Sequence, residues 1–276
     1  MRYDLIGPKT LVVPLAVLIV LATAACAYRP KIITLPLPPE EQPVEQISVP
    51  SVKKTIKIGE KLTYAVDWRG IPSGKIILEV KEIVTIGQRQ YYHIIAQALP
   101  NSFFSFFYKV NYLVETYVDT ETYQPIKFHK KRILRNVVSE ETINFDYARN
   151  EALWQYTGSE NKIIRLTANS QDLLSFLYFF RLQEIKLGKE YPLDIIYNAS
   201  VWEAKVKVDT FELVKFNGTG IKTFTIKLIS RLAKHITGGE KMKIYFSFSD
   251  GHLPLLFHLY TKIGPLTGVL REPPHN

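Results

Sequence analysis

Hydrophobic and polar positions alternate along most of the chain. Leu62, Tyr64 and Val66 are hydrophobic, and the residues between them are smaller or more polar. This period of two predicts a half-buried β-strand. Turn-forming residues at 69–74 separate this strand from a second one at 75–84, so the two strands are expected to form a hairpin.

Similar alternating segments, separated by turn residues, recur to the end of the chain. They lie at residues 91–98, 112–118, 126–134, 138–145, 153–156, 163–166, 202–215, 222–230, 241–248, 253–260 and 266–271. Many short strands at such spacing predict a mainly β fold. We expect one large antiparallel curved sheet that forms an open barrel or a sandwich.

One segment has the period of a helix instead. Leu173, Phe176, Leu177 and Phe180 are spaced i, i+3, i+4 and i+7, and they follow the helix-starting residue Asp172. This pattern predicts an apolar helix near residues 171–182. A helix this apolar should plug one face or one mouth of the sheet.

The N-terminus resembles a bacterial export signal. Residues 10–28 carry no charge and follow the basic residues Arg2 and Lys9. Small residues precede Cys26, as in a lipobox, so we expect residues 1–25 to be removed and Cys26 to carry lipid. An uncleaved membrane anchor and an ordinary buried thiol remain the alternatives. Because Ala27 is not an inner-membrane retention signal, we expect a lipid-anchored protein at the outer membrane, facing the periplasm.

Residues 26–55 are rich in proline, which favours extended chain, and are predicted to form a tether. Residues 56–276 should then form one β-rich globular domain. The hydrophobic fraction of 46 % can supply its core. The single cysteine excludes an internal disulfide and a cysteine-based zinc site within one chain.

Five ordered segments of the globular part resemble the bacterial domain-of-unknown-function family 3108. They are GEKLTYAVDWRGIPSGKIILEV at 59–80, FYKVNYLVETYVDTETYQPIKFHKK at 107–131, FDYARN at 145–150, QDLLSFLYFFR at 171–181 and IYFSFSDGHLPLLFHLYTKIGPLTGVL at 244–270. The resemblance implies an exported, mainly β envelope protein. It implies no catalytic residue, and Phe248 stands where the family pattern has tryptophan.

The sequence contains no signature of a zinc protease, a nucleophile elbow, a phosphate loop, a dinucleotide fold or a calcium loop. We therefore expect no enzyme activity, no cofactor and no metal site. Five acidic residues beside predicted turns are expected to close turns or cap helices: Asp67, Glu115, Asp119, Asp146 and Asp172. A pair of these acids acting on cell-wall or surface polysaccharide is the alternative.

Aromatic residues are concentrated after Pro100, where alternation is lost. This run is expected either to pack in the core as a crossover or short helix, or to form a lid that binds an acyl chain or the membrane interface. Together with aromatic residues of the first strand and the helix, it supplies our candidate ligand-binding residues. These are Tyr64, Trp68, Phe103, Phe104, Phe106, Phe107, Tyr108, Phe176 and Phe180.

The chain has a formal net charge of +9, and its densest basic patch consists of Lys130, Lys131, Arg132 and Arg135. In an exported protein, the anionic partner of such a patch would be lipid headgroups or an envelope polymer and not nucleic acid. The alternative is an edge strand that charge protects from pairing with other chains.

These features favour a non-catalytic binding or transfer module for an amphipathic, lipid or other envelope molecule. Two other classes of function remain open. One is a structural or assembly lipoprotein that holds another envelope protein, and the other is the polysaccharide hydrolase.

Overall fold

The computed structural model of the chain describes residues 32–36, 56–107, 110–134, 136–216, 219–230, 242–248, 251–261 and 264–271. The predicted signal peptide, Cys26, Tyr108 and Arg135 lie outside these ranges, and so does the side chain of Phe107.

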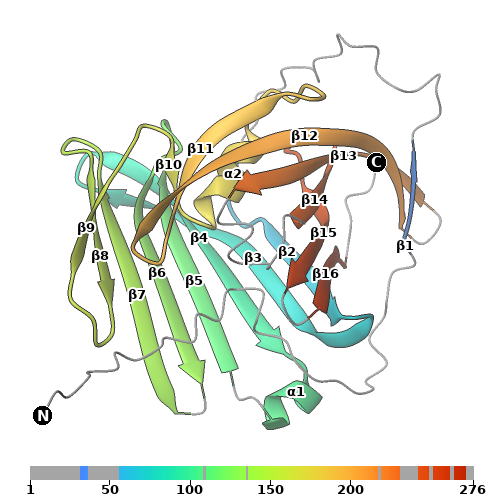
Figure 1. Cartoon of the computed structure of the whole chain (residues 1–276), viewed down its shortest axis with the longest axis horizontal. Coiled ribbons are helices and arrows are strands. Elements are labelled where there is room, and N and C mark those ends of the chain that lie inside the picture. The colour runs from blue at the N-terminus through green and yellow to red at the C-terminus, as the bar shows by residue number, and fades with distance from the viewer. Residues whose placement is uncertain are drawn as a thin grey trace, which may run out of the picture.

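The described residues form a 16-stranded sheet and two short helices (Figure 1). The elements are β1 (Ile32–Pro36), β2 (Lys61–Trp68), β3 (Ile71–Ile86), β4 (Arg89–Pro100), α1 (Ser102–Phe107), β5 (Val110–Asp119), β6 (Pro125–Leu134), β7 (Val137–Asp146), β8 (Glu151–Tyr156), β9 (Lys162–Arg165), β10 (Ser170–Gln171), α2 (Ser175–Arg181), β11 (Glu190–Tyr197), β12 (Ser200–Phe216), β13 (Thr219–Ser230), β14 (Met242–Ser247), β15 (Pro254–Thr261) and β16 (Gly264–Leu270). The mainly β prediction is confirmed, and so is the apolar helix near residues 171–182.

The sheet consists of two meanders joined by one ladder. Its order is β10-β11-β12-β13-β14-β15-β16-β2-β3-β4-β5-β6-β7-β8-β9, so the pairing of β16 with β2 joins the second meander to the first. Neighbours are antiparallel except for β10 and β11. Within the described residues, β9 and β10 are the two ends of this order, and the sheet curls without closing (Figure 1). It is therefore the open-barrel form of the predicted curved sheet.

Register shifts help the long strands to bend. They occur between Val80 and Glu82 in β3 and between Val208 and Thr210 in β12. An extra residue on one strand of a pair bends that strand and increases its local twist. Figure 1 shows the result, with β12 arching over α2 on the concave side of the sheet.

The strand β1 is a departure from the predicted tether. Ile32–Pro36 pairs antiparallel with residues 212–216 of β12, although the proline-rich stretch 26–55 is predicted to be extended spacer. The segment IITLP contains β-branched and aliphatic residues ahead of the main group of prolines, which suits it to pairing. The predicted tether is therefore interrupted by five residues that belong to the sheet.

The core consists of two hydrophobic clusters. The first lies mainly on the inner faces of β2–β8 and of β15 and β16, and the second lies between α2 and strands β11–β14. Leu177 of α2 and Phe257 of β15 pack against both clusters. Gly268 lies opposite Phe257 in the ladder, and a methyl group there would overlap the Phe257 ring. A glycine in this strand therefore leaves room for the ring on the concave side of the sheet.

Replacement of Gly74 tests how closely β3 and β4 approach. An added methyl group would clash with the backbone carbonyl of Leu99, which cannot move without distorting the ladder. We expect Gly74→Ala to lower the free energy of unfolding by about 1–3 kcal/mol, as overpacking does. Urea denaturation followed by tryptophan fluorescence measures this, with the exposed neighbour Lys75→Ala as the control. Equal midpoints for the two variants would contradict the close approach.

Candidate functional site

The start of α2 is held to the sheet by a buried aspartate. Asp172 Oδ1 accepts hydrogen bonds from the backbone N–H groups of Leu174 (2.7 Å) and Ser175 (2.8 Å), as predicted for a helix-starting residue. Its Oδ2 accepts a hydrogen bond from Thr116 Oγ1 of β5 at 2.6 Å. Burial raises the pKa of this carboxyl, although the hydrogen bonds act in the opposite direction. Asp172 therefore fixes both the helix and its distance from β5.

The end of α2 is held by a buried ion pair. Arg181 Nη1 and Nη2 donate to the two carboxylate oxygens of Glu60 at 2.6 and 2.7 Å, and Nε donates to the Gly251 carbonyl at 2.8 Å. The Arg181 side chain is 3 % exposed, and that of Glu60 is 10 % exposed. Burial works against the charge on Arg181, but Glu60 outweighs it, so the pKa of Arg181 is raised. The helix is therefore attached at both ends to segments outside it.

A cavity of about 160 Å³ lies between α2 and the concave face of the sheet. Its walls come from both meanders and from the residues that lead into α2. The lining residues are Tyr64, Ile76, Leu78, Ala96, Gln97, Ala98, Tyr112, Val114, Phe128, Lys130, Leu173, Leu174, Phe176, Leu177, Tyr197, Met242, Ile244, Pro254, Phe257, Leu259 and Leu266. Most of them are hydrophobic, so the cavity suits an apolar group.

The polar atoms of this wall are few and mostly engaged. The Tyr64 hydroxyl donates to the Pro254 carbonyl at 2.7 Å, so its ring faces the cavity while its polar atom is satisfied. Lys130 is different, because it is a cation in a largely apolar lining. Its ammonium forms an ion pair with Glu141, and Trp154 Nε1 donates to the other oxygen of that carboxylate at 2.8 Å. The cavity therefore has one distinctly polar side.

Burial makes the charged form of Lys130 less favourable. Its side chain is 15 % exposed, and that of Glu141 is 2 % exposed. Desolvation lowers the pKa of the Lys130 ammonium to about 8, and repulsion from Arg132 adds to this. The ammonium also lies 5.6 Å from the centre of the Tyr197 ring, which belongs to the other meander. Lys130 thus helps to bring the two halves of the open sheet together.

The sequence candidates for ligand binding are divided between the cavity and the core. Tyr64 and Phe176 line the cavity. Phe180 packs in the second cluster against Tyr191, Phe224 and Phe246 and is outside the lining described above, as is Trp68. Sequence reasoning missed Phe128 and Phe257, which alternate inward on their strands. Alternation along each strand shows which residues share a face with Phe128 or Phe257. It does not show which of the two faces of the strand points to the cavity.

The aromatic run after Pro100 contains the short helix α1, which lies beside the ends of β4 and β5 (Figure 1). Phe104 is 2 % exposed and belongs to the first cluster, and Phe103 packs against that cluster. Phe106 is 80 % exposed. None of these three is among the described residues that line the cavity. The structure therefore places this run partly in the core and partly at the surface.

The basic strand is not at an edge. β6 pairs with β5 on one side and with β7 on the other, so the prediction of a charge-protected edge strand is wrong. Lys130 lines the cavity, and Arg132, two residues along, shares its face of the strand. Lys131 lies on the opposite face, where it pairs with Glu140 at 2.8 Å. Strand alternation therefore divides the predicted patch between the inside and the outside of the sheet.

Most of the five acids close turns, as predicted. Asp67 accepts from the Gly70 N–H, Asp146 accepts from the Arg149 N–H, and Asp172 closes the turn that leads into α2. Asp119 accepts from two N–H groups of its turn, and these overcome burial, so the pKa of Asp119 is lowered.

Glu115 departs from this rule, because it lies within β5 and not at a turn. Its carboxylate is hydrogen-bonded to His93 Nε2 at 3.1 Å and to His129 Nδ1 at 3.2 Å, across three strands. Burial opposes its ionisation, but these two contacts outweigh burial and lower the pKa of Glu115. The prediction that Glu115 closes a turn is wrong, because cross-strand pairing brings the two histidines to it.

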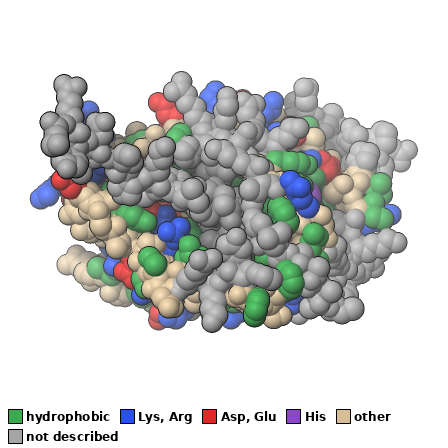
Figure 2. Space-filling view, turned by 60° about the horizontal axis from the view of Figure 1, so that its bottom comes forward, with side chains coloured by type: hydrophobic (Ala, Val, Ile, Leu, Met, Phe, Trp, Pro, Cys, Tyr) green, Lys and Arg blue, Asp and Glu red, His purple; other side chains and the backbone are tan. Residues whose placement is uncertain are grey.

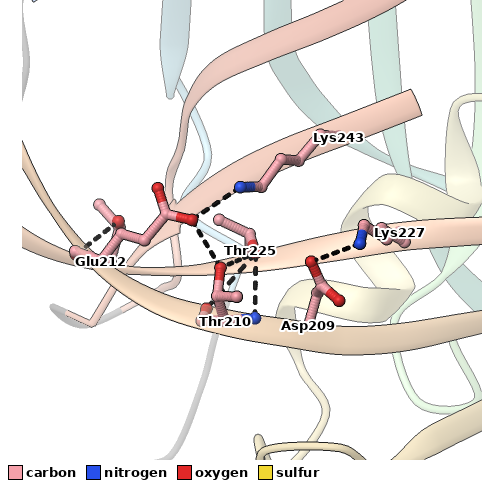
Figure 3. Close-up of polar contacts among 7 residues, drawn as sticks. Asp209, Thr210, Glu212, Thr225, Lys227 and Lys243 are labelled. Atoms are coloured by element: carbon pink, nitrogen blue, oxygen red, sulfur yellow. Dashed lines mark hydrogen bonds and ion pairs between the residues drawn. The ribbon is translucent and has the colours of Figure 1, made fainter. Parts of the chain in front are cut away.

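A second polar network lies on β12, β13 and β14, away from the cavity (Figure 3). Glu212 accepts hydrogen bonds from Lys243 Nζ at 2.7 Å and from Thr210 Oγ1 at 2.6 Å. Asp209 pairs with Lys227 at 2.8 Å. These groups compensate one another next to the register shift in β12, so we interpret the network as cross-strand stabilisation.

No helix among the described residues is long and apolar enough to cross a membrane. Nor do these residues bring together three or more histidine, cysteine, aspartate or glutamate side chains in a way that could hold a metal ion.

Comparison with known proteins yields a family and a distant structural likeness. The family model described as "Protein of unknown function (DUF3108)" matches residues 63–271. No curated protein matches the chain. Among solved structures, the chain is similar to a β-barrel-like protein of the domain of unknown function DUF1849 from Brucella abortus. That match has 11 % identity and a TM-score of 0.45, and it covers 77 % of this chain and 95 % of that one.

The buried ion pair at the end of α2 can be tested by substitution. Removing one partner leaves the other charged and buried, so we expect Arg181→Met alone to lower the free energy of unfolding by about 3–5 kcal/mol. Glu60→Leu alone should cost a similar amount. The double variant should cost less than the sum of the two, because it leaves no uncompensated charge. Urea denaturation of the four proteins measures the coupling, and additive losses would contradict a direct interaction.

Proposed function

The chain belongs to the DUF3108 family of proteins of unknown function, and we propose that it is a non-catalytic module that binds an amphipathic molecule of the bacterial envelope. The observation that carries this proposal is the apolar cavity of about 160 Å³ between α2 and the sheet. The hydrocarbon part of the ligand occupies this cavity. A lipid on Cys26 holds the module at the membrane that supplies the ligand.

The size of the cavity limits what can enter it. An apolar cavity of about 150 Å³ is large enough for a benzene molecule. A short stretch of a single hydrocarbon chain is of a size comparable to benzene. Pockets that enclose whole drug-sized ligands are larger, about 300–1,000 Å³. The cavity therefore suits part of one chain, with the polar end of the ligand outside or at the rim.

The interior is a better candidate for ligand binding than the visible surface. On the face shown in Figure 2, the hydrophobic side chains among the described residues lie in small groups between basic, acidic and other side chains. A broad apolar patch would be the usual mark of a surface that docks a protein or a membrane. The alternative of an assembly lipoprotein that holds another envelope protein is also weakened. The basic strand β6 lies between β5 and β7, so it cannot pair with a strand of a partner.

Filling part of the cavity should weaken binding. Ala98 lies on its wall, and Ala98→Leu adds three carbon atoms there. We expect wild type to bind 1-octanol and Ala98→Leu to bind it about tenfold more weakly, measured by isothermal titration calorimetry. Because the added atoms enter existing space, the variant should retain its stability. In a filled core the same change would cost about 1–3 kcal/mol.

The control is Ala65→Leu, which adds the same atoms on the opposite face of β2 from the cavity residue Tyr64. It should bind 1-octanol as wild type does. Equal binding by wild type and Ala98→Leu would contradict the proposal, and so would a loss of stability in Ala98→Leu without any octanol binding by wild type.

The membrane attachment is tested separately. We expect mature wild type to carry acyl chains on Cys26, detected by mass spectrometry of its N-terminal peptide, and to remain with membranes after a high-pH wash. Cys26→Ser should lack this mass, because serine offers no thiol for the lipid. A free Cys26 thiol on a protein that still begins at Met1 would support the uncleaved anchor instead.

A further inference from the structure

We propose that the ligand of this cavity carries an anionic headgroup, and that Lys130 and Arg132 bind that headgroup through charge-assisted hydrogen bonds. This inference rests on the proposed function, because it concerns the polar end of the same ligand. The shared chemistry is a carboxylate or a phosphate on a single hydrocarbon chain.

The two cations lie on the same face of β6, next to the apolar lining. Lys130 is itself part of the lining. Arg132 lies directly opposite Tyr112 in the β5–β6 ladder, and Tyr112 also lines the cavity. Residues two apart on a strand are about 6.6 Å apart along it and point to the same side. A single anionic group between them can therefore be reached from both.

The charges on this side of the cavity do not cancel. Lys130 and Arg132 are two positive charges, and Glu141, which forms an ion pair with Lys130, is one negative charge. Among the described residues, the hydrogen-bond partner of the Arg132 guanidinium is the neutral hydroxyl of Ser139, which accepts from Nε at 3.2 Å. The other nearby carboxylates, Glu115 and Glu140, belong to the opposite face of the sheet, with Lys131.

A positive charge beside an apolar cavity is less well solvated than one at the open surface, so an anionic partner there is favourable. Desolvation is the main cause of the lowered pKa of Lys130, and repulsion from Arg132 adds to it. A bound anion would relieve this repulsion and neutralise the remaining charge.

Donor groups are also available for the headgroup. An ammonium has three N–H donors and a guanidinium has five. One N–H donor of Lys130 is directed to Glu141, and one N–H donor of Arg132 is directed to Ser139. The other donors of both groups are the ones that we propose for the headgroup. Glu141 is itself held in place by Trp154, so it orients the Lys130 ammonium and does not need to move when a ligand arrives.

The decisive variant is Arg132→Gln, because it removes one cation and leaves the Lys130–Glu141 pair intact. Arg132 is only partly buried, so the protein is expected to fold, and circular dichroism verifies this. The matched control is the adjacent Lys131→Gln, which removes the same charge from the opposite face of β6. The full chain is studied in an amphipathic polymer that is too large to enter the cavity.

The ligands are octanoate and 1-octanol, which share one chain length and differ in headgroup charge. We expect wild type to bind octanoate about tenfold more tightly than 1-octanol, the gain from one charge-assisted hydrogen bond. Arg132→Gln should lose this preference while its affinity for 1-octanol stays unchanged. Lys131→Gln should retain the preference. Octyl phosphate should behave like octanoate, and inorganic phosphate, which has no chain, should bind far more weakly than octyl phosphate.

The results separate this inference from the proposed function. If wild type and Arg132→Gln bind octanoate and 1-octanol equally, the headgroup proposal is overturned while the cavity proposal stands. If inorganic phosphate binds as tightly as octyl phosphate, the site is one for a free anion, and the headgroup proposal is overturned. If neither octanoate nor 1-octanol binds to wild type, both proposals are overturned.

Discussion

The attachment of α2 at both ends is the constraint on which the rest of this structure depends. Asp172 ties the start of the helix to Thr116 of β5, and Arg181 ties its end to Glu60 and Gly251. The two attachments differ in kind: Asp172 is buried and bonded to neutral donors, so losing one leaves a buried polar group with fewer partners, whereas breaking the Arg181–Glu60 pair leaves a buried charge without compensation. We infer that these contacts hold the helix at its present distance from the concave face of the sheet.

The cavity follows from this constraint. Leu173, Phe176 and Leu177 face the sheet but are held at a distance set by polar contacts at the two helix ends. Strand curvature sets the opposite wall, with bulges that bend β3 and β12 around the helix. A fully packed core would need either a released helix or larger side chains where Ala96 and Ala98 lie.

Local patterns predicted much of this fold, and contacts distant in sequence account for what they missed. Alternation at Leu62, Tyr64 and Val66 specifies a strand by itself, and Asp172 starts a helix through N–H groups two and three residues away. The partner of Arg181 is 121 residues away, and no local pattern points to it. The same is true of Glu115, which meets His93 and His129 only because their strands are neighbours.

The candidate site was predictable only in part for the same reason. Tyr64 and Phe176 line the cavity, but Phe180 of α2 packs in the second cluster and Phe106 is exposed. Lys130 and Arg132 were identified as members of a basic patch, whereas the curl of the sheet places the face that they share on the side of the cavity. Which face of a strand points inward depends on how the whole sheet pairs and curls. Alternation within one strand carries no information about that.

The central claim is that the space between α2 and the sheet holds a ligand. Native mass spectrometry of the protein purified from bacterial membranes tests this most directly. We expect one noncovalently bound, single-chain amphiphile per polypeptide, released when the protein unfolds and identifiable by its mass. A polypeptide that carries no such molecule when purified, and that takes up none when membrane lipids are offered, would contradict it.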